Sequence, residues 1–241
     1  MATKQVRIPD IGTVTLYKRR GNRSLRLSIG PAGDVRVSLP YWLPYKAGEQ
    51  FALSKAPWIA ENRPKTHGTT LLHGHAIGKA HRIYFEQQAQ ATKVAARVAA
   101  NEIRITFPAI YSHEDYDVQE AARSASIRAL KKEAEALLPQ RLQALAAQTG
   151  FSYSSVSVKQ LKSRWGSCNS QQEITLNLFL MQLPWHLIDY VLMHELTHTK
   201  VMRHGAPFWR EMERHVPGAK QLRSQMGNYQ PILTPRGQAV A

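Results

Sequence analysis

Residues 5–40 show the alternation of apolar and polar side chains that is typical of β-strands. Apolar residues occupy every second position of residues 25–29 and again of residues 35–39, with Ser or Arg between them. Successive side chains of a strand point to opposite faces, so both stretches predict strands with one apolar and one basic face. The Gly and Pro residues between them predict the turn of a hairpin. The same alternation predicts shorter strands at residues 82–86, 93–98 and 102–107.

Elsewhere, apolar residues recur at the three- and four-residue spacing of helices. Pro139 is expected to kink or divide a long helix, because proline lacks the N–H that a helix interior needs, and Gly150 is expected to end it. Phe208, Trp209 and Met212 are apolar at helical spacing and are predicted to be core residues beneath the functional site described below. Strands followed by helices indicate an α+β fold with a β-rich N-terminal region. The predicted helices cover residues 46–62, 118–148 and 206–215.

The strongest chemical signal is a His-Glu-x-x-His pattern at residues 194–198, inside an apolar helical stretch. Residues four apart lie on one face of a helix, so His194 and His198 can hold one metal ion. Glu195 would then lie beside a water at that metal and act as general base. A buried glutamate between two histidines that served no such purpose would be costly. The pattern therefore predicts a metal-dependent hydrolase.

A catalytic zinc usually has three protein ligands and one open position. His204 is the leading candidate for the third, and we expect one Zn²⁺ ion at this site. An unbroken helix would carry His204 roughly 9 Å past His198, too far to share a metal. The helix must therefore end near Lys200 to Arg203, and Gly205 and Pro207 supply the break. The rival ligands are Glu211, Glu213 and His215.

Arg164 stands in the stretch Arg-Trp-Gly-Ser-Cys at residues 164–168, between two predicted strands. A guanidinium there could stabilise an oxyanion or bind a phosphate or carboxylate, so Arg164 is predicted to act in catalysis. Equally, it could brace the fold by pairing with Asp189 or Glu173.

Trp165 and Asn177 are predicted to bind substrate, although the Asn177 amide could instead cap a loop. Cys168 could approach the metal as a thiolate, but a buried structural thiol is the better expectation. An extended substrate could add to an edge strand beside the cleft. We expect that edge strand at residues 173–177 rather than at 156–161.

Several of these motifs occur together, in a fixed order, over residues 123–217. In this respect the chain resembles the YgjP-like metallopeptidases, a family related to the SprT-like and WLM metalloproteases. The likeness is looser over residues 20–110. The motifs that carry it are Lys162–Cys168, Ile174-x-Leu176-Asn177, Pro184, Asp189–Val191, His194-Glu195-Leu196-x-His198, His204-Gly205 and Phe208-Trp209.

The resemblance implies a small zincin-like catalytic domain behind a β-rich N-terminal region. It also implies that His194, His198 and His204 bind zinc and that Glu195 is the catalytic base. One branch of the family has been linked to nucleoside triphosphate hydrolysis, and the related proteases act on proteins crosslinked to DNA. The expected divisions are a basic β-rich region at 1–116, the zincin-like domain at 117–235 and a loose tail at 236–241.

Composition adds a basic character to this picture. The 241 residues carry a net charge of +15, and residues 1–82 hold 14 Lys and Arg against four Asp and Glu. Such a field attracts polyanions, so DNA or a nucleotide is a candidate partner of the N-terminal region. One cysteine excludes an internal disulfide. With neither a signal peptide nor an apolar run of membrane-spanning length, we expect a cytoplasmic protein without a membrane partner.

The leading functional hypothesis is a zinc metallopeptidase that acts on a protein or peptide. The first alternative is a nucleoside triphosphate phosphohydrolase on the same metal site. Against it, such enzymes usually use Mg²⁺ held by carboxylates, and no carboxylate cluster is evident. The second alternative is a nucleic-acid-binding protein with a structural zinc. A structural site would normally have four protein ligands and would leave Glu195 without a role.

Overall fold

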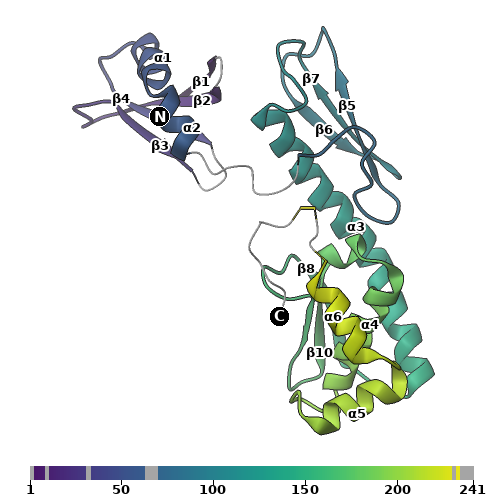
Figure 1. The fold of residues 1–241 in the computed structure, drawn as a ribbon. Coiled ribbons are helices and arrows are strands. Elements are labelled where there is room, and N and C mark those ends of the chain that lie inside the picture. The colour runs from purple at the N-terminus through teal and green to yellow at the C-terminus, as the bar shows by residue number, and fades with distance from the viewer. Residues whose placement is uncertain (1–2, 9–10, 31–33, 63–69, 230–231, 234–241) are drawn as a thin grey trace. The chain divides into compact units, whose positions relative to one another are not determined.

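The computed structural model describes residues 3–8, 11–30, 34–62, 70–229 and 232–233 (Figure 1). Strands dominate its N-terminal part and helices its C-terminal part, so the predicted α+β class is confirmed. The strands are β1 Thr3–Ile8, β2 Gly12–Arg19, β3 Arg26–Ile29, β4 Val35–Pro40, β5 Arg82–Gln87, β6 Ala95–Val98, β7 Glu102–Phe107, β8 Ser155–Lys159, β9 Gly166–Cys168 and β10 Glu173–Asn177. The helices are α1 Tyr45–Ser54, α2 Ala56–Asn62, α3 Tyr116–Thr149, α4 Trp185–His198, α5 Ala206–His215 and α6 Ala219–Gly227, with a 3₁₀ turn, η1, at Leu178–Gln182.

The chain divides into two compact units, one of Met1–His67 with Glu114–Glu120 and one of Gly68–His113 with Ala121–Ala241. The functional division that we expect at residue 117 stays a prediction. No helix in the described part of the chain is both long and apolar enough to cross a membrane.

The three sheets formed by the described residues contain the same three-stranded arrangement. In each, a central strand pairs in parallel with the strand that comes first and antiparallel with its own hairpin partner. The strand orders are β2-β4-β3 with β1 added outside β2, β5-β7-β6, and β8-β10-β9. The expectation that residues 173–177 form an edge strand was therefore wrong, because β10 is central and β9 is an edge.

The N-terminal unit is built on the apolar face that the alternation predicts. Val14 and Leu16 of β2 and Val37 and Leu39 of β4 are almost completely buried and pack against α1 and α2. The single helix predicted over 46–62 is two helices, because the chain turns at Lys55. The predicted hairpin is confirmed as β3 and β4, and its turn at 31–33 lies outside the described residues.

Helix α3 runs unbroken through Pro139, so this proline does not divide the helix, and the alternative of a kink stays a prediction. A proline in a helix interior costs roughly 3 kcal/mol, but Leu138 and Leu142 on the same turns are fully buried and offset that cost. The helix ends at Gly150, whose φ of +70° is the left-handed conformation that favours glycine. Arg141 of α3 binds Asp189 of α4 through two hydrogen bonds of 2.7 Å, which fixes α4 against α3.

A second link sets the position of α4 from its N-terminal end. The carboxylate of Glu133 in α3 accepts hydrogen bonds from the backbone N–H groups of Lys79, Ala80 and His81, at 2.6, 3.1 and 3.0 Å. His81 Nδ1 lies 2.5 Å from the same carboxylate. We call these residues, 79–81 and 133, the Glu133 clasp. From the clasp, the Lys79 ammonium donates to the carbonyl of Leu183, just before α4 begins.

Candidate metal centre

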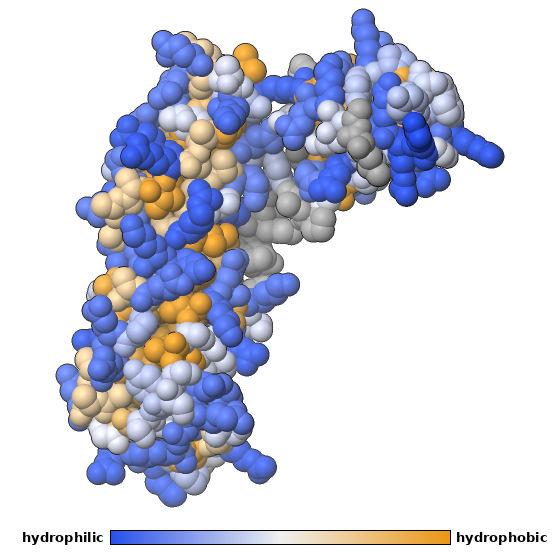
Figure 2. All heavy atoms as spheres, turned by 180° about the vertical axis from the view of Figure 1, so that it is seen from behind, coloured by the Kyte–Doolittle hydropathy of each residue, from blue (hydrophilic) through white to orange (hydrophobic). Residues whose placement is uncertain are grey.

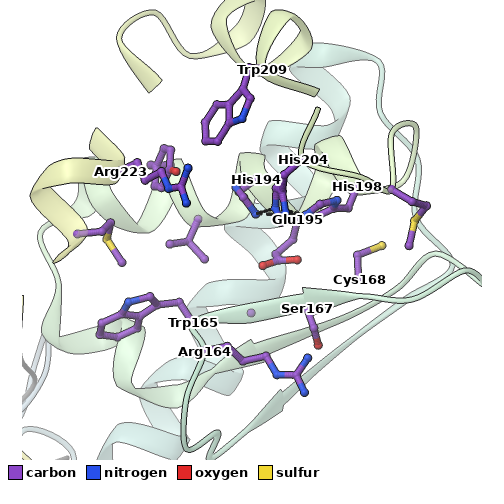
Figure 3. A pocket seen from close by; sticks show the side chains of 15 residues that line it. Arg164, Trp165, Ser167, Cys168, His194, Glu195, His198, His204, Trp209 and Arg223 are labelled. Carbon is purple, nitrogen blue, oxygen red and sulfur yellow. Dashed lines mark hydrogen bonds between the residues drawn. The ribbon is translucent and has the colours of Figure 1, made fainter. Parts of the chain in front are cut away.

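Helix α4 carries both histidines of the motif on one face. Pro184 precedes its first residue, and most of the helix is buried. The helix ends at His198 and the chain turns back before α5, which brings His204 to the same point. The three imidazole Nε2 atoms lie 3.2 Å apart between His194 and His198, and 3.0 Å apart in the other two pairs (Figure 3).

Their environment keeps these imidazoles neutral. Burial lowers the pKa of His194 to about 3, with further lowering from the charges of His198, His204 and Arg223. Burial is also the main cause that lowers the pKa of His198 and of His204. Three neutral nitrogens that face one another at this distance fit a shared cation better than a hydrogen-bond network. Two nitrogens bound to one tetrahedral zinc lie about 3.3 Å apart.

Phe208 supports this arrangement from α5. Its ring centroid lies 4.9, 4.6 and 4.8 Å from the ring centroids of His194, His198 and His204. The Val201 carbonyl lies 3.1 Å from His198 Nδ1 and orients that ring so that Nε2 faces the other two. One apolar ring thus fixes the three imidazoles together.

Glu195 lies beside the imidazoles, 5% exposed, and its Oε2 has no hydrogen-bond partner among the described residues. Burial raises the pKa of Glu195 to about 8, against the opposing charge of Arg164. Gly166 of β9 lies directly against this side chain. A Cβ at Gly166 would come within 2.6 Å of Glu195 Oε1, so only glycine leaves room for the carboxylate in this position.

The three imidazoles and Glu195 line a cavity of about 370 Å³ (Figure 3). Strand β9 forms one side, and α4, α5 and α6 form the rest. Arg164 and Trp165, both predicted site residues, line it. Cys168 lines it too and is only half-buried, so the expectation of a buried structural thiol was wrong. Cys168 does not join the histidine group. Burial and the neighbouring Glu195 raise the pKa of the Cys168 thiol to about 11.

Two further sequence predictions concern Asn177 and the partners of Arg164. Asn177 does not line the cavity. Its amide donates to the carbonyls of Leu161 and Arg164 at 3.1 and 2.8 Å, and accepts from the N–H of Phe179, so it caps a loop. Neither suggested partner of Arg164 binds it, since Asp189 pairs with Arg141 and Glu173 accepts from Asn169.

The rival ligands lie elsewhere. Glu211 is within 3.6 Å of Lys200 and 3.4 Å of His215, and Glu213 accepts from the N–H of Gly218. Within the described part of the chain, the three histidines are the one group of His, Cys, Asp and Glu side chains close enough to hold a metal ion.

Residues outside the predicted site also line the cavity, among them Tyr190, Trp209 and Arg223. Tyr190 precedes His194 by one helical turn and is 5% exposed. Trp209, predicted to be core, is only half-buried and lines the cavity, whereas Phe208 and Met212 are buried as predicted. Arg223 of α6 lies 5.3 Å from the centre of the Trp209 ring and faces the cavity. Helix periodicity indicates Tyr190, but no local signal indicates Arg223.

Comparison with known proteins agrees with the chemistry of this cavity. The model of the YgjP-like metallopeptidase domain matches residues 23–229. No curated protein matches the chain. Among solved structures, the metallopeptidase zymogen abylysin of Pyrococcus abyssi is 26% identical, with 38% of this chain and 93% of that chain covered and a TM-score of 0.35. The zymogen jannalysin of Methanocaldococcus jannaschii is 18% identical, with 37% and 92% covered and a TM-score of 0.34.

The family match extends over most of the 241 residues and includes the whole cavity. It confirms the family that the order of the motifs predicts. The chain therefore belongs to the YgjP-like metallopeptidase family and is a metal-dependent hydrolase.

Proposed function

We propose that the protein is a zinc-dependent peptidase in which His194, His198 and His204 hold one Zn²⁺ ion and Glu195 is the general base. The observation that carries this proposal is the triangle of neutral Nε2 atoms, 3.0–3.2 Å apart, directly beside a buried carboxylate. A fourth protein ligand is not among the described residues, which supports a catalytic rather than a structural site.

When bound, zinc would polarise the peptide carbonyl and make a water molecule acidic. Glu195 would be kept ionised by the positive charge of the bound ion, although burial raises its pKa. Its carboxylate would then take a proton from that water and pass it to the nitrogen of the leaving amine. The unpartnered Oε2 atom supports this role, because a buried oxygen without a hydrogen bond is available to a ligand. Gly166 would hold the carboxylate in this position by contact.

Strand β9 is the natural place for an extended peptide. It is an edge strand of its sheet, and its residues line the cavity beside Glu195. A peptide that added to this edge would form backbone hydrogen bonds and pass the imidazole group. Trp165, Arg164 and Arg223 would then contact its side chains or stabilise negative charge on the reacting oxygen.

The same two arginines favour a second candidate, a nucleoside triphosphate phosphohydrolase. Arg164 and Arg223 both line the cavity, and neither forms an ion pair with a carboxylate in the described part of the chain. Guanidinium groups bind phosphate oxygens as readily as carboxylates. The family assignment favours the peptidase.

The test is a product assay by mass spectrometry on wild type, Glu195→Gln and the exposed control Glu135→Gln. Each is loaded with zinc, its metal content is measured, and it is incubated with an unfolded protein and, separately, with the four nucleoside triphosphates. We expect peptide products from wild type and the control, and a rate about 10²- to 10⁴-fold lower in Glu195→Gln with the zinc retained. Full activity in Glu195→Gln would refute the assigned base, and nucleotide products alone would move the function to phosphohydrolysis.

A separate variant tests the ligand set. His204→Ala removes one of three imidazoles, and we expect it to lose most of its zinc in equilibrium dialysis against a chelator. His215→Ala, the matched control on α5, should keep the metal. Full zinc occupancy in His204→Ala would exclude His204 as a ligand.

A further inference from the structure

Basic and aromatic side chains lie together at one end of the sheet of the N-terminal unit, and none of them lines the cavity of the metal centre. Strand β2 ends at Arg19, next to Pro40 of β4, and β3 begins at Arg26, next to Ser38 of β4. The β2–β3 loop and the residues that follow β4 therefore meet at the same end. We call this the basic-aromatic surface, and it consists of Lys18, Arg19, Arg20, Arg23, Arg26, Tyr41 and Trp42.

The five cations of this surface lie within nine consecutive residues, without an acidic residue among them. In the described part of the chain, none of them forms an ion pair with a carboxylate. Other cations of the same unit do so, and the pairs are Lys4–Glu49, Arg7–Asp115 and Arg36–Asp34. Residues 19–24 and Arg26 line a shallow hollow. The positive charge there is concentrated and available to an external anion.

Two large aromatic side chains stand beside these cations. Tyr41 is 59% exposed and Trp42 is 69% exposed, which is unusual for rings of this size. Lys18 Nζ donates to the Tyr41 carbonyl at 3.1 Å, and the Arg20 guanidinium lies 5.9 Å from the centre of the Tyr41 ring. These contacts hold Tyr41 against the basic loop, and Trp42 is the next residue in the chain. In the view of Figure 2 the visible face of this unit is mostly hydrophilic.

We propose that the basic-aromatic surface binds single-stranded nucleic acid, with phosphates on the arginines and a base stacked on Trp42. A polynucleotide strand alternates anionic phosphates with flat apolar bases, and the surface presents cations next to exposed rings. In a duplex the base faces are stacked on one another and cannot reach an indole. An acidic peptide would use the cations but would leave both exposed rings without a partner.

This binding does not depend on the proposed metal centre, because every residue that forms the surface belongs to the N-terminal unit. It would add a nucleic-acid-binding function to a metal-dependent hydrolase. The binding is expected to be insensitive to sequence, because every base has a stacking face and the arginines contact only phosphates.

The test is fluorescence anisotropy of the full-length protein with a labelled oligothymidylate of about 20 nucleotides. The competing probes are a duplex and a polyglutamate peptide, both of the same length. Measurements between about 50 and about 200 mM salt give the slope of affinity against salt. Each titration is repeated after removal of metal with a chelator, so that a failure of the zinc proposal does not affect the result.

Two matched pairs of variants and one conservative variant separate charge from stacking. Arg19→Gln/Arg20→Gln/Arg23→Gln removes three charges from the surface, and Lys93→Gln/Lys132→Gln/Lys220→Gln removes three exposed charges from the other unit. Trp42→Ala removes the exposed indole. Trp58→Ala removes an indole that is 45% exposed on α2, and Trp42→Phe keeps a stacking ring.

We expect the single strand to bind more tightly than the duplex or the peptide. The triple arginine variant should bind at least tenfold more weakly, with a salt slope lower by about two. Trp42→Ala should bind roughly tenfold more weakly with an unchanged slope, and Trp42→Phe should recover most of the loss. Equal binding of the duplex or the peptide, equal weakening in the two triple variants, or no effect of Trp42→Ala when its melting temperature matches wild type would each refute the proposal.

Discussion

Glu133 and Glu195 are almost equally buried, 6% and 5% exposed, yet their pKa values are shifted in opposite directions. Burial raises the pKa of Glu133, but hydrogen bonds from His81 and from the N–H groups of the Glu133 clasp outweigh it, so that its pKa is lowered. At Glu195 burial prevails, and the pKa rises to about 8. Each oxygen of Glu133 has a partner, whereas Oε2 of Glu195 has none among the described residues. The first carboxylate serves the fold, and the second is kept available for a ligand.

The largest effect should come from breaking the satisfied carboxylate. In Glu133→Gln, the amide NH₂ would face N–H donors, and the charge that those donors stabilise would be lost. We expect the free energy of unfolding to fall by about 2–4 kcal/mol in urea denaturation. Glu135→Gln, an exposed neighbour on the same helix, should change it by less than about 0.5 kcal/mol. Equal effects of the two variants would contradict a stabilising clasp.

The next prediction disturbs the unsatisfied carboxylate without changing it. Gly166→Ala introduces a Cβ that would lie 2.6 Å from Glu195 Oε1, so the carboxylate must move. We expect peptidase activity to fall by about 10²-fold while zinc binding is retained, as measured by metal content and turnover on the same sample. Gly227→Ala, where a Cβ meets nothing within 4 Å, is the matched control. Normal activity in Gly166→Ala would show that the position of Glu195 is not critical.

A smaller effect concerns acid stability. Because the pKa of Glu133 is lower in the folded protein than its ordinary value of 4.5, its contribution to stability is complete above pH 4.5. That contribution is lost as the pH falls from 4.5 through the lowered folded pKa. We expect the free energy of unfolding to decrease over this range, and to decrease less steeply in Glu133→Gln. Parallel pH profiles for the two proteins would contradict this expectation.

The smallest effect should be that of Glu195→Gln on the stability of the metal-free protein. Its Oε2 has no hydrogen bond to lose, so we expect the free energy of unfolding to change by less than about 1 kcal/mol. The measurement is urea denaturation in a chelator, next to Glu133→Gln. A destabilisation as large as that of Glu133→Gln would mean that both carboxylates serve the fold.

The sequence predicts the imidazole group because its information is local. His194 and His198 share a helix face, and the six residues from His198 to His204 allow only a short reversal of the chain. The same periodicity extends to Tyr190. Arg223, by contrast, belongs to a helix whose place beside the cavity depends on tertiary contacts, and nothing in its own segment indicates it.

The Glu133 clasp could not be predicted for a different reason. Residues 131–135 carry two lysines and two glutamates, a pattern typical of an exposed helix face. The partners of Glu133 are mostly backbone N–H groups, which leave no trace in the side-chain pattern. The central position of β10 likewise could not be predicted, because alternation predicts a strand but not its neighbours in a sheet.

The clasp also has a consequence for the order in which the protein can be built. All partners of Glu133 precede it in the chain, so a growing polypeptide can close the clasp soon after Glu133 has been synthesised. At that stage the segment from Leu183 to His204 does not yet exist. When it emerges, the backbone of Lys79 is already bound to Glu133, and the Lys79 ammonium can donate to the Leu183 carbonyl. The helix that carries His194 and His198 can thus form against a part of the fold that is already in place, before α5 and α6 are added.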